Sequence, residues 1–138
     1  MKFLNALLWI WQLPQHLLAI IIYLILIISK KIVAIDNFLS SKVYWANISW
    51  GVSLGNYIFL GGAYSDGVTV KHEYGHSIQS KIFGPLYLLI IGLPSITMNI
   101  LSVILFYRGN KKFYKNYYNR WPESQADKLG KVENRPPL

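Results

Sequence analysis

Two of the three histidines lie four residues apart, in the segment His72-Glu73-Tyr74-Gly75-His76. On a helix, residues with this spacing share one face and are one turn apart, so both imidazoles could bind the same metal ion. The carboxylate of Glu73 could then accept a proton from a water molecule that the metal has made acidic. The pattern therefore predicts a helical zinc site in which His72 and His76 are ligands and Glu73 is the general base.

A catalytic zinc ion usually has three protein ligands and keeps one position for water. The remaining histidine, His16, follows Pro14 within an apolar segment. We expect its ring to be hydrogen-bonded at a helix break, so a carboxylate is the expected third ligand. The candidate acids are Asp36, Asp66, Glu123, Asp127 and Glu133.

Two of these acids lie four residues apart in Glu123-Ser124-Gln125-Ala126-Asp127, directly after Trp121-Pro122. Because proline suits the first turn of a helix, the segment predicts a helix over 122–130 that carries both acids on one face. We expect Glu123 to be the third ligand. We expect Asp127 to hydrogen-bond a histidine ring N–H, a common arrangement around zinc. Without the histidine pair, two solvated surface acids would be the better interpretation.

Between the apolar N-terminus and the histidine motif, the chain is rich in β-forming residues. Residues 42–50 and 52–60 both contain many β-branched and aromatic side chains, and Gly51 separates them. This pattern predicts a short β-hairpin over 42–61, or two short strands. The metal-site helix, over 66–83, would be capped by Ser65 or Asp66 and would end before Gly84 and Pro85.

The composition favours a membrane. The chain has 138 residues, enough for one domain, with 53% hydrophobic and 14% charged residues and no cysteine. Two segments, 3–29 and 86–107, carry no formal charge, are interrupted by Pro14 and Pro94, and are each long enough to cross a bilayer. Burial in a soluble core is the alternative, but the run 17–28 is apolar on every side. We expect a mainly helical α+β membrane protein with two proline-broken membrane segments.

The second apolar segment separates the two halves of the expected metal site. A single crossing by 86–107 would place His76 and Glu123 on opposite sides of the membrane. We therefore expect this segment either to turn back near Gly92 or Pro94 or to tilt so that a loop returns, and to be re-entrant or interfacial. Five basic residues lie between the apolar segments and eight follow the second. A segment that returns would place all thirteen basic residues on one side of the membrane. The positive-inside tendency predicts that this side is cytoplasmic.

The order of the two motifs resembles a known family. HEYGH followed by an apolar segment and E-x-x-A-D is similar to the gluzincin metalloproteases, above all the integral-membrane group of the CAAX prenyl proteases and the bacterial heat-shock membrane protease. HEYGHSIQS, GPLYLLIIGLPS and ADKLG also resemble small bacterial membrane proteins. The resemblance implies zinc ligands His72, His76 and Glu123, the base Glu73 and the supporting acid Asp127. It further implies a strand near 52–60 that binds an extended peptide.

The functional expectation is a membrane-associated metallopeptidase with one zinc ion per protomer. Its site would face the cytoplasm in a bacterial inner membrane, and its partners would be the lipid bilayer and a peptide or membrane-protein substrate. Tyr117 or Tyr118 could stabilise the oxyanion, but both suit an interfacial anchor equally well. The net charge of +8 could suggest nucleic acid, but no nucleic-acid fold signature is present. The alternatives are a holin-like or accessory membrane protein without catalysis, or a metal-binding interaction module.

Overall fold

The N-terminal apolar segment forms two helices joined at a sharp bend. The computed structural model of the protein describes residues 2–62 and 67–135. Helix α1 (Lys2–Trp11) and helix α2 (Leu13–Ile28) are inclined by 79°. Pro14 lies in the first turn of α2, where its missing N–H has no intrahelical partner to lose. The expected break at Pro14 is therefore confirmed.

The bend docks the N-terminal helices onto the rest of the molecule. Trp11 Nε1 donates to the carbonyl of Lys81 at 3.1 Å, and Gln15 Nε2 donates to the carbonyl of Gly84 at 2.5 Å. The fully buried ring of His16 accepts a hydrogen bond from the Asn56 N–H at 3.3 Å, and its Nδ1 lies 3.1 Å from the Trp9 carbonyl oxygen. His16 is thus hydrogen-bonded at a helix break, as expected.

A mixed four-stranded sheet follows, with strand order β1-β2-β4-β3. The strands are β1 (Ile32–Phe38), β2 (Ser41–Ala46), β3 (Gly51–Leu54) and β4 (Tyr57–Gly61). Strands β1 and β2 form one antiparallel hairpin, β3 and β4 form another, and the two hairpins join through the parallel pair β2 and β4. The expected single hairpin over 42–61 is wrong, because a turn at Gly55 (φ +65°) and Asn56 divides the segment 52–60 into two strands.

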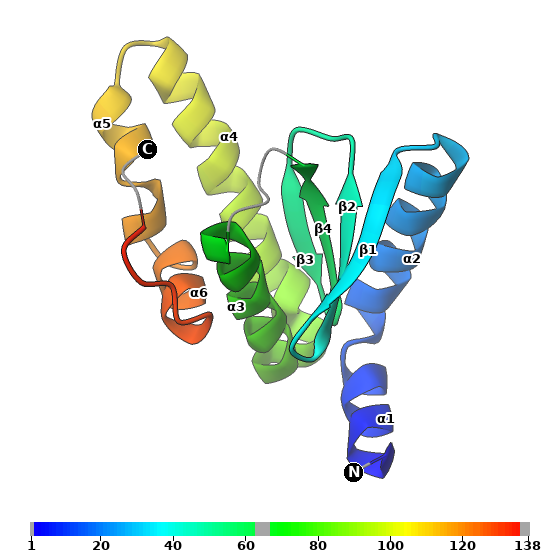
Figure 1. The fold of residues 1–138 in the computed structure, drawn as a ribbon. Coiled ribbons are helices and arrows are strands. Elements are labelled where there is room, and N and C mark those ends of the chain that lie inside the picture. Colours follow the sequence, from blue (N-terminus) through cyan, green and yellow to red (C-terminus); the bar gives the residue numbers. More distant parts are fainter. Residues whose placement is uncertain (1, 63–66, 136–138) are drawn as a thin grey trace.

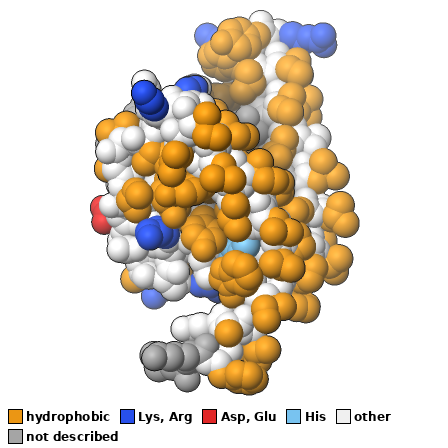
Figure 2. All heavy atoms as spheres, turned by 90° about the vertical axis from the view of Figure 1, so that its right-hand side faces the viewer, with side chains coloured by type: hydrophobic (Ala, Val, Ile, Leu, Met, Phe, Trp, Pro, Cys, Tyr) orange, Lys and Arg blue, Asp and Glu red, His pale blue; other side chains and the backbone are white. Residues whose placement is uncertain are grey.

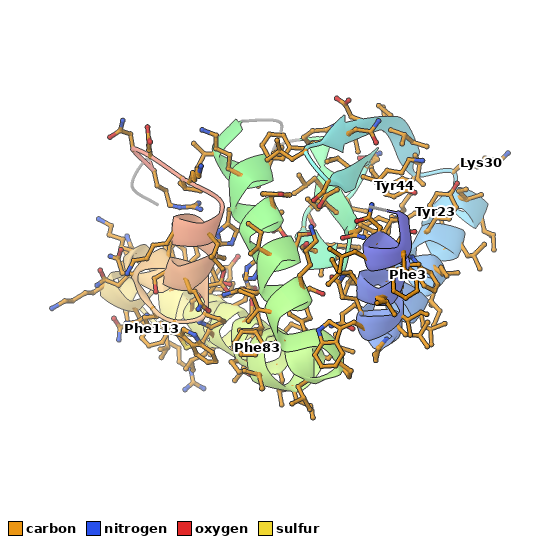
Figure 3. All side chains as sticks on the ribbon, turned by 90° about the horizontal axis from the view of Figure 1, so that it is seen from below. Phe3, Tyr23, Lys30, Tyr44, Phe83 and Phe113 are labelled. Carbon is orange, nitrogen blue, oxygen red and sulfur yellow. The ribbon has the colours of Figure 1, made fainter. Side chains whose placement is uncertain are left out.

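The two central strands are buried on both faces of the sheet. Toward α2, the core contains Ala19, Leu26, Tyr44, Ala46, Leu54 and Phe59. Toward helix α3, it contains Val43, Ile58, Leu60 and Val70. Successive residues of β2 and β4 thus point to opposite faces. Figure 3 shows Tyr23 of α2 beside Tyr44 of β2, and their ring centroids are 5.0 Å apart.

Helix α3 (Gly67–Phe83) carries the histidine motif and agrees with the helix expected over 66–83. The proposed caps Ser65 and Asp66 lie outside the described residues. The helix ends at Gly84, whose φ is +52°. A side chain at Gly84 would collide with the Trp11 ring, so glycine is required both by the backbone conformation and by the close approach of α1.

The second apolar segment is a continuous helix rather than a hairpin. After a 3-10 turn (Gly84–Leu86), a π-helical turn (Leu88–Gly92) runs directly into α4 (Leu93–Tyr107). The expected turn near Gly92 and Pro94 is wrong. Pro94 falls in the first turn of α4, and the wider π-turn before it changes the hydrogen-bond register, so the proline is accommodated without a break.

The chain then folds back along α4 in short segments (Figure 1). These are α5 (Lys111–Lys115), a 3-10 turn (Tyr117–Asn119) and α6 (Glu123–Leu129), which agrees with the helix expected over 122–130. Helix α6 packs against α3. The return of the chain, and not a turn within the apolar segment, brings Glu123 back to the histidine helix.

Large apolar side chains cover much of the surface. Within residues 2–62 and 67–135, the helix Leu88–Tyr107 has the length and composition to cross a membrane, and the bent pair 3–28 passes the same test only if its two helices are counted together. The core helix of a soluble protein can meet these criteria as well. Figure 2 shows hydrophobic side chains spread over the face that includes α2. On α4 the exposed residues include Leu93, Ile96, Ile100 and Ile104, which follow helical spacing along one side.

Candidate metal centre

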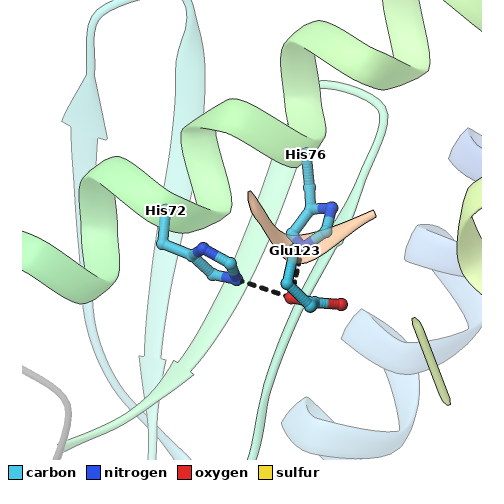
Figure 4. Close-up of side chains that lie close together, drawn as sticks. All are labelled: His72, His76 and Glu123. Atoms are coloured by element: carbon cyan, nitrogen blue, oxygen red, sulfur yellow. Dashed lines mark hydrogen bonds and ion pairs between the residues drawn. The ribbon is translucent and has the colours of Figure 1, made fainter. Parts of the chain in front are cut away.

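Helices α3 and α6 bring two histidines and one glutamate together (Figure 4). The Nε2 atoms of His72 and His76 lie 3.0 Å and 3.2 Å from Oε2 of Glu123. One donor atom from each residue lies within 4.8 Å of the others, and all three residues are buried. Among the described residues this is the one group of histidine and acidic side chains that could hold a metal ion.

Two glycines allow the two helices to approach this closely. A Cβ atom built on Gly75 would lie 1.9 Å from the carbonyl oxygen of Ala126 in α6. A Cβ on Gly130 would likewise collide with the carbonyl oxygen of Lys71 in α3. The backbones of α3 and α6 are therefore in direct contact, and this contact sets the distance between the histidines and Glu123.

The second nitrogen of each imidazole ring has its own partner. His72 Nδ1 lies 2.6 Å from Oδ1 of Asp127, and His76 Nδ1 lies 2.7 Å from Oε1 of Gln79. Both partner atoms accept hydrogen bonds. The Asp127 atom is a carboxylate oxygen, and the Gln79 atom is the amide oxygen, since Gln79 Nε2 donates to the carbonyl of Pro122 at 3.1 Å. With Nδ1 protonated on both rings, both Nε2 lone pairs point toward Glu123, which is the tautomer that metal ligation requires.

A guanidinium group holds the acid behind His72. Arg135 donates from Nε to Asp127 Oδ2 at 2.9 Å and from Nη2 to Asp127 Oδ1 at 2.5 Å. The same guanidinium lies 3.5 Å from the centre of the Tyr118 ring, and the edge of that ring faces His72 at a centroid distance of 5.1 Å. The segment 131–135 thus folds back onto the site.

The pKa values follow from these contacts. Burial alone would lower the pKa of His72, but hydrogen bonds to Asp127 and Glu123 and the charge of Glu73 raise it to about 9. Burial alone would raise the pKa of Glu123 and Asp127, but the hydrogen bonds and charges of their cationic partners hold both values below the usual range. Without a metal ion, the protonated and positively charged ring of His72 thus lies between the carboxylates of Glu123 and Asp127.

The side chain of Glu73 faces the first residue of β3. Its side chain is 8% exposed, and burial raises its pKa although the charges of His76 and His72 oppose the shift. A Cβ on Gly51, the first residue of β3, would lie 3.2 Å from Glu73 Oε1. The carboxylate therefore lies beside the edge strand of the sheet, near enough to His76 and His72 for their charges to oppose the rise in its pKa.

The other residues that the sequence nominated lie in different settings. Burial and the charge of Glu123 raise the pKa of Tyr117, whose hydroxyl lies near the side chains of Ser95, Asn99 and Glu123. Burial raises the pKa of Tyr118 to about 12, against the opposing charge of Arg135. Two of the alternative ligands, Asp36 and Glu133, are exposed and away from the histidines, and the third, Asp66, lies outside the described residues.

Three residues of the centre were not identified as such from the sequence. Gln79 lies three residues after His76, a helical spacing that could have suggested the hydrogen bond between the two side chains. Ser95 of α4 donates to Glu123 Oε1 at 2.5 Å. Neither Ser95 nor Arg135 has a sequence signal, because each reaches the site only through the return of the chain.

No protein-family model, no curated protein and no solved structure matches the chain. The chemistry of the donor set is therefore the basis for assigning a metal. Two imidazole nitrogens and one carboxylate oxygen, with the other imidazole nitrogens hydrogen-bonded, fit a divalent ion that accepts nitrogen and oxygen ligands, as zinc does.

Proposed function

We propose that the protein is a membrane-associated, zinc-dependent metallopeptidase. The observation that carries the proposal is the convergence of His72 Nε2, His76 Nε2 and Glu123 Oε2 beside the buried carboxylate of Glu73. Three protein donors leave a further position for water in a tetrahedral site, the arrangement of catalytic and not of structural zinc. A zinc ion held there would supply Lewis acidity and lower the pKa of water toward neutrality.

The protein's own groups supply the remaining steps of hydrolysis. Glu73 takes the proton from the attacking water and delivers it to the nitrogen of the leaving amine. Asp127 and Gln79 hold the imidazole rings of His72 and His76 in the ligating tautomer. Tyr118, whose ring edge faces His72, is the preferred candidate for stabilising the oxyanion, because the hydroxyl of Tyr117 lies near the negative charge of Glu123.

A peptide substrate is supported by the position of β3. This strand is at one edge of the sheet, is antiparallel to β4 and packs against α3. An extended peptide can add to such an edge through backbone hydrogen bonds. Because Gly51 at the start of β3 lies against Glu73, a peptide bound there would pass the base.

The apolar surfaces of α2 and α4 support the membrane location. The C-terminal ends of α2 and α4 lie at the same end of the molecule in Figure 1, and in the sequence α2 is followed by Lys30 and Lys31 and α4 by Arg108 and Lys111. Cations at one end of two apolar helices suit an anionic headgroup surface. In the proposed arrangement this surface is the cytoplasmic face of a bacterial inner membrane.

Zinc quantitation and peptide cleavage test the proposal together. Purified protein should hold about one zinc ion, and His76→Ala should lose it. Glu73→Gln keeps the side-chain size but removes the base, so it should retain zinc while cleavage of extended peptides falls by about 10²–10⁴-fold. Equal cleavage by Glu73→Gln and the unaltered protein would refute the role of Glu73.

A second candidate function is a non-catalytic metal-binding module. The low exposure of the donors, 4% for His72, 6% for His76 and 1% for Glu123, favours it, because structural metal sites are closed. Zinc-loaded protein that cleaves no member of a broad peptide library, with or without lipid vesicles, would support this candidate over the peptidase.

A further inference from the structure

The two oxygens of Glu123 have different surroundings. Oε2 faces the Nε2 atoms of His72 and His76 at 3.0 Å and 3.2 Å. Oε1 accepts a hydrogen bond from the hydroxyl of Ser95 at 2.5 Å. The carboxylate is 1% exposed, so its hydrogen-bond partners come from the protein around it.

Ser95 is the third residue of α4 and differs from the other hydroxyl residues of that helix. The hydroxyls of Thr97 and Ser102 donate to carbonyls of their own helix, those of Leu93 at 2.8 Å and Asn99 at 2.7 Å. This is the usual partner of serine and threonine within a helix. The hydroxyl of Ser95 instead donates across to α6, and a hydroxyl bonded to a carboxylate is among the stronger hydrogen bonds in proteins.

We propose that Ser95 is a positioning residue that makes Glu123 a one-oxygen ligand. A carboxylate can bind a metal through one or both oxygens. Because Ser95 occupies Oε1, Glu123 presents Oε2 alone to the ion, and the position that Oε1 would take stays open to water. This inference rests on the proposed metal site. It also makes α4 a part of the metal centre and not only an apolar anchor.

A second hydroxyl, that of Tyr117, also lies near the Glu123 carboxylate. The same Tyr117 hydroxyl lies near Ser95 as well. With Ser95 removed, Oε2 of Glu123 still faces the Nε2 atoms of His72 and His76, so metal binding persists. What changes is the freedom of Oε1 to turn toward the ion.

The test uses cobalt-substituted protein, because Co²⁺ absorbs visible light more strongly with four ligands than with five or six. Ser95→Ala should still bind one Co²⁺, but with a weaker visible absorption. With zinc bound, its kcat should fall by about 10-fold, the usual size of an effect from a residue that orients a ligand, while KM is unchanged. Ser95→Thr keeps the hydroxyl and should restore both properties.

Ser102→Ala is the matched control. Ser102 lies seven residues after Ser95 on the same side of α4, is 2% exposed and bonds only within its own helix. This variant should keep the spectrum and kcat of the unaltered protein. If Ser95→Ala does not fold, Ser95→Cys retains the side-chain volume with a much weaker donor and serves the same comparison.

The outcomes separate this inference from the proposed function. Unaltered protein that binds neither Co²⁺ nor zinc would overturn both. Metal-loaded protein in which Ser95→Ala has an unchanged spectrum and kcat would overturn the role of Ser95 alone. The same loss in Ser102→Ala as in Ser95→Ala would also overturn it, because the effect would then belong to the packing of α4.

Discussion

Gly75→Ala should separate the two halves of the metal centre. The new methyl group would lie 1.9 Å from the Ala126 carbonyl oxygen, whereas ordinary contacts of a Cβ atom begin at 3.4 Å. The obstacle is backbone of α6 and cannot rotate away as a side chain would. Relief therefore requires α3 and α6 to move apart by about 1.5 Å, the difference between these two distances.

A displacement of that size is large for a metal site. His76 Nε2 and Glu123 Oε2 are 3.2 Å apart, and metal–ligand distances are typically kept to within about 0.2 Å. We expect Gly75→Ala to lower zinc affinity by at least the roughly 10–100-fold that follows loss of a ligand's support. Overpacking of this kind should also reduce the free energy of unfolding by about 1–3 kcal/mol.

Gly67→Ala is the matched control, because it adds the same methyl group to the same helix. A Cβ at Gly67 meets no atom of residues 2–62 and 67–135 within 4 Å. Helix propensity alone should stabilise this variant by up to about 1 kcal/mol, with zinc affinity unchanged. Zinc affinity comes from competition with a chromogenic chelator and stability from urea unfolding. If Gly75→Ala binds zinc as tightly as Gly67→Ala does, the described contact between α3 and α6 does not set the geometry of the site.

Two further predictions concern His72 and its support. In the metal-free protein, the protonated ring of His72 stabilises the fold, because its pKa is about 9 in the folded chain and 6.5 in the unfolded chain. The free energy of unfolding, measured with urea, should therefore be highest below pH 6.5 and fall by about 3 kcal/mol as the pH rises through about 9. Zinc must displace this proton, so zinc affinity should rise over the same pH range, and a pH-independent affinity would contradict the raised pKa. Arg135→Gln should weaken zinc binding, measured by chelator competition, by about 10-fold, because Asp127 loses both guanidinium hydrogen bonds. The control Arg120→Gln removes a hydrogen bond to the Phe113 carbonyl at 3.0 Å and should leave zinc affinity unchanged.

Local periodicity was sufficient to predict the helices that carry the site. The four-residue spacing of His72 and His76, and of Glu123 and Asp127, places each pair on one helical face whatever the remainder of the fold is. Pro14 predicted the bend between α1 and α2 for the same reason, since proline acts on its own turn of helix. These features depend on neighbours within about one turn, which is what a sequence displays directly.

Features that depend on distant partners were not predictable in the same way. The parallel pairing of β2 with β4 joins residues such as Val43 and Ile58, and no local pattern distinguishes it from a simple hairpin. Gly92 and Pro94 suggested a break, but the π-helical turn before Pro94 keeps the helix continuous. Ser95 and Arg135 became visible as parts of the site only once the path of the chain after α4 was known.

The path of that chain also bears on how the protein would sit in a membrane. The segment that returns along α4 carries Lys111, Lys112, Lys115 and Arg120, and each cation at the centre of a bilayer costs about 2.5–3.5 kcal/mol or more. A fully spanning α4 would draw this segment into the hydrocarbon, because the short helix α5 packs against α4. An α4 that lies at the interface, with Leu93, Ile96 and Ile100 in lipid and Ser95 toward the protein, avoids that cost. In that arrangement His76 and Glu123 are on the same side of the bilayer although the helix between them is unbroken.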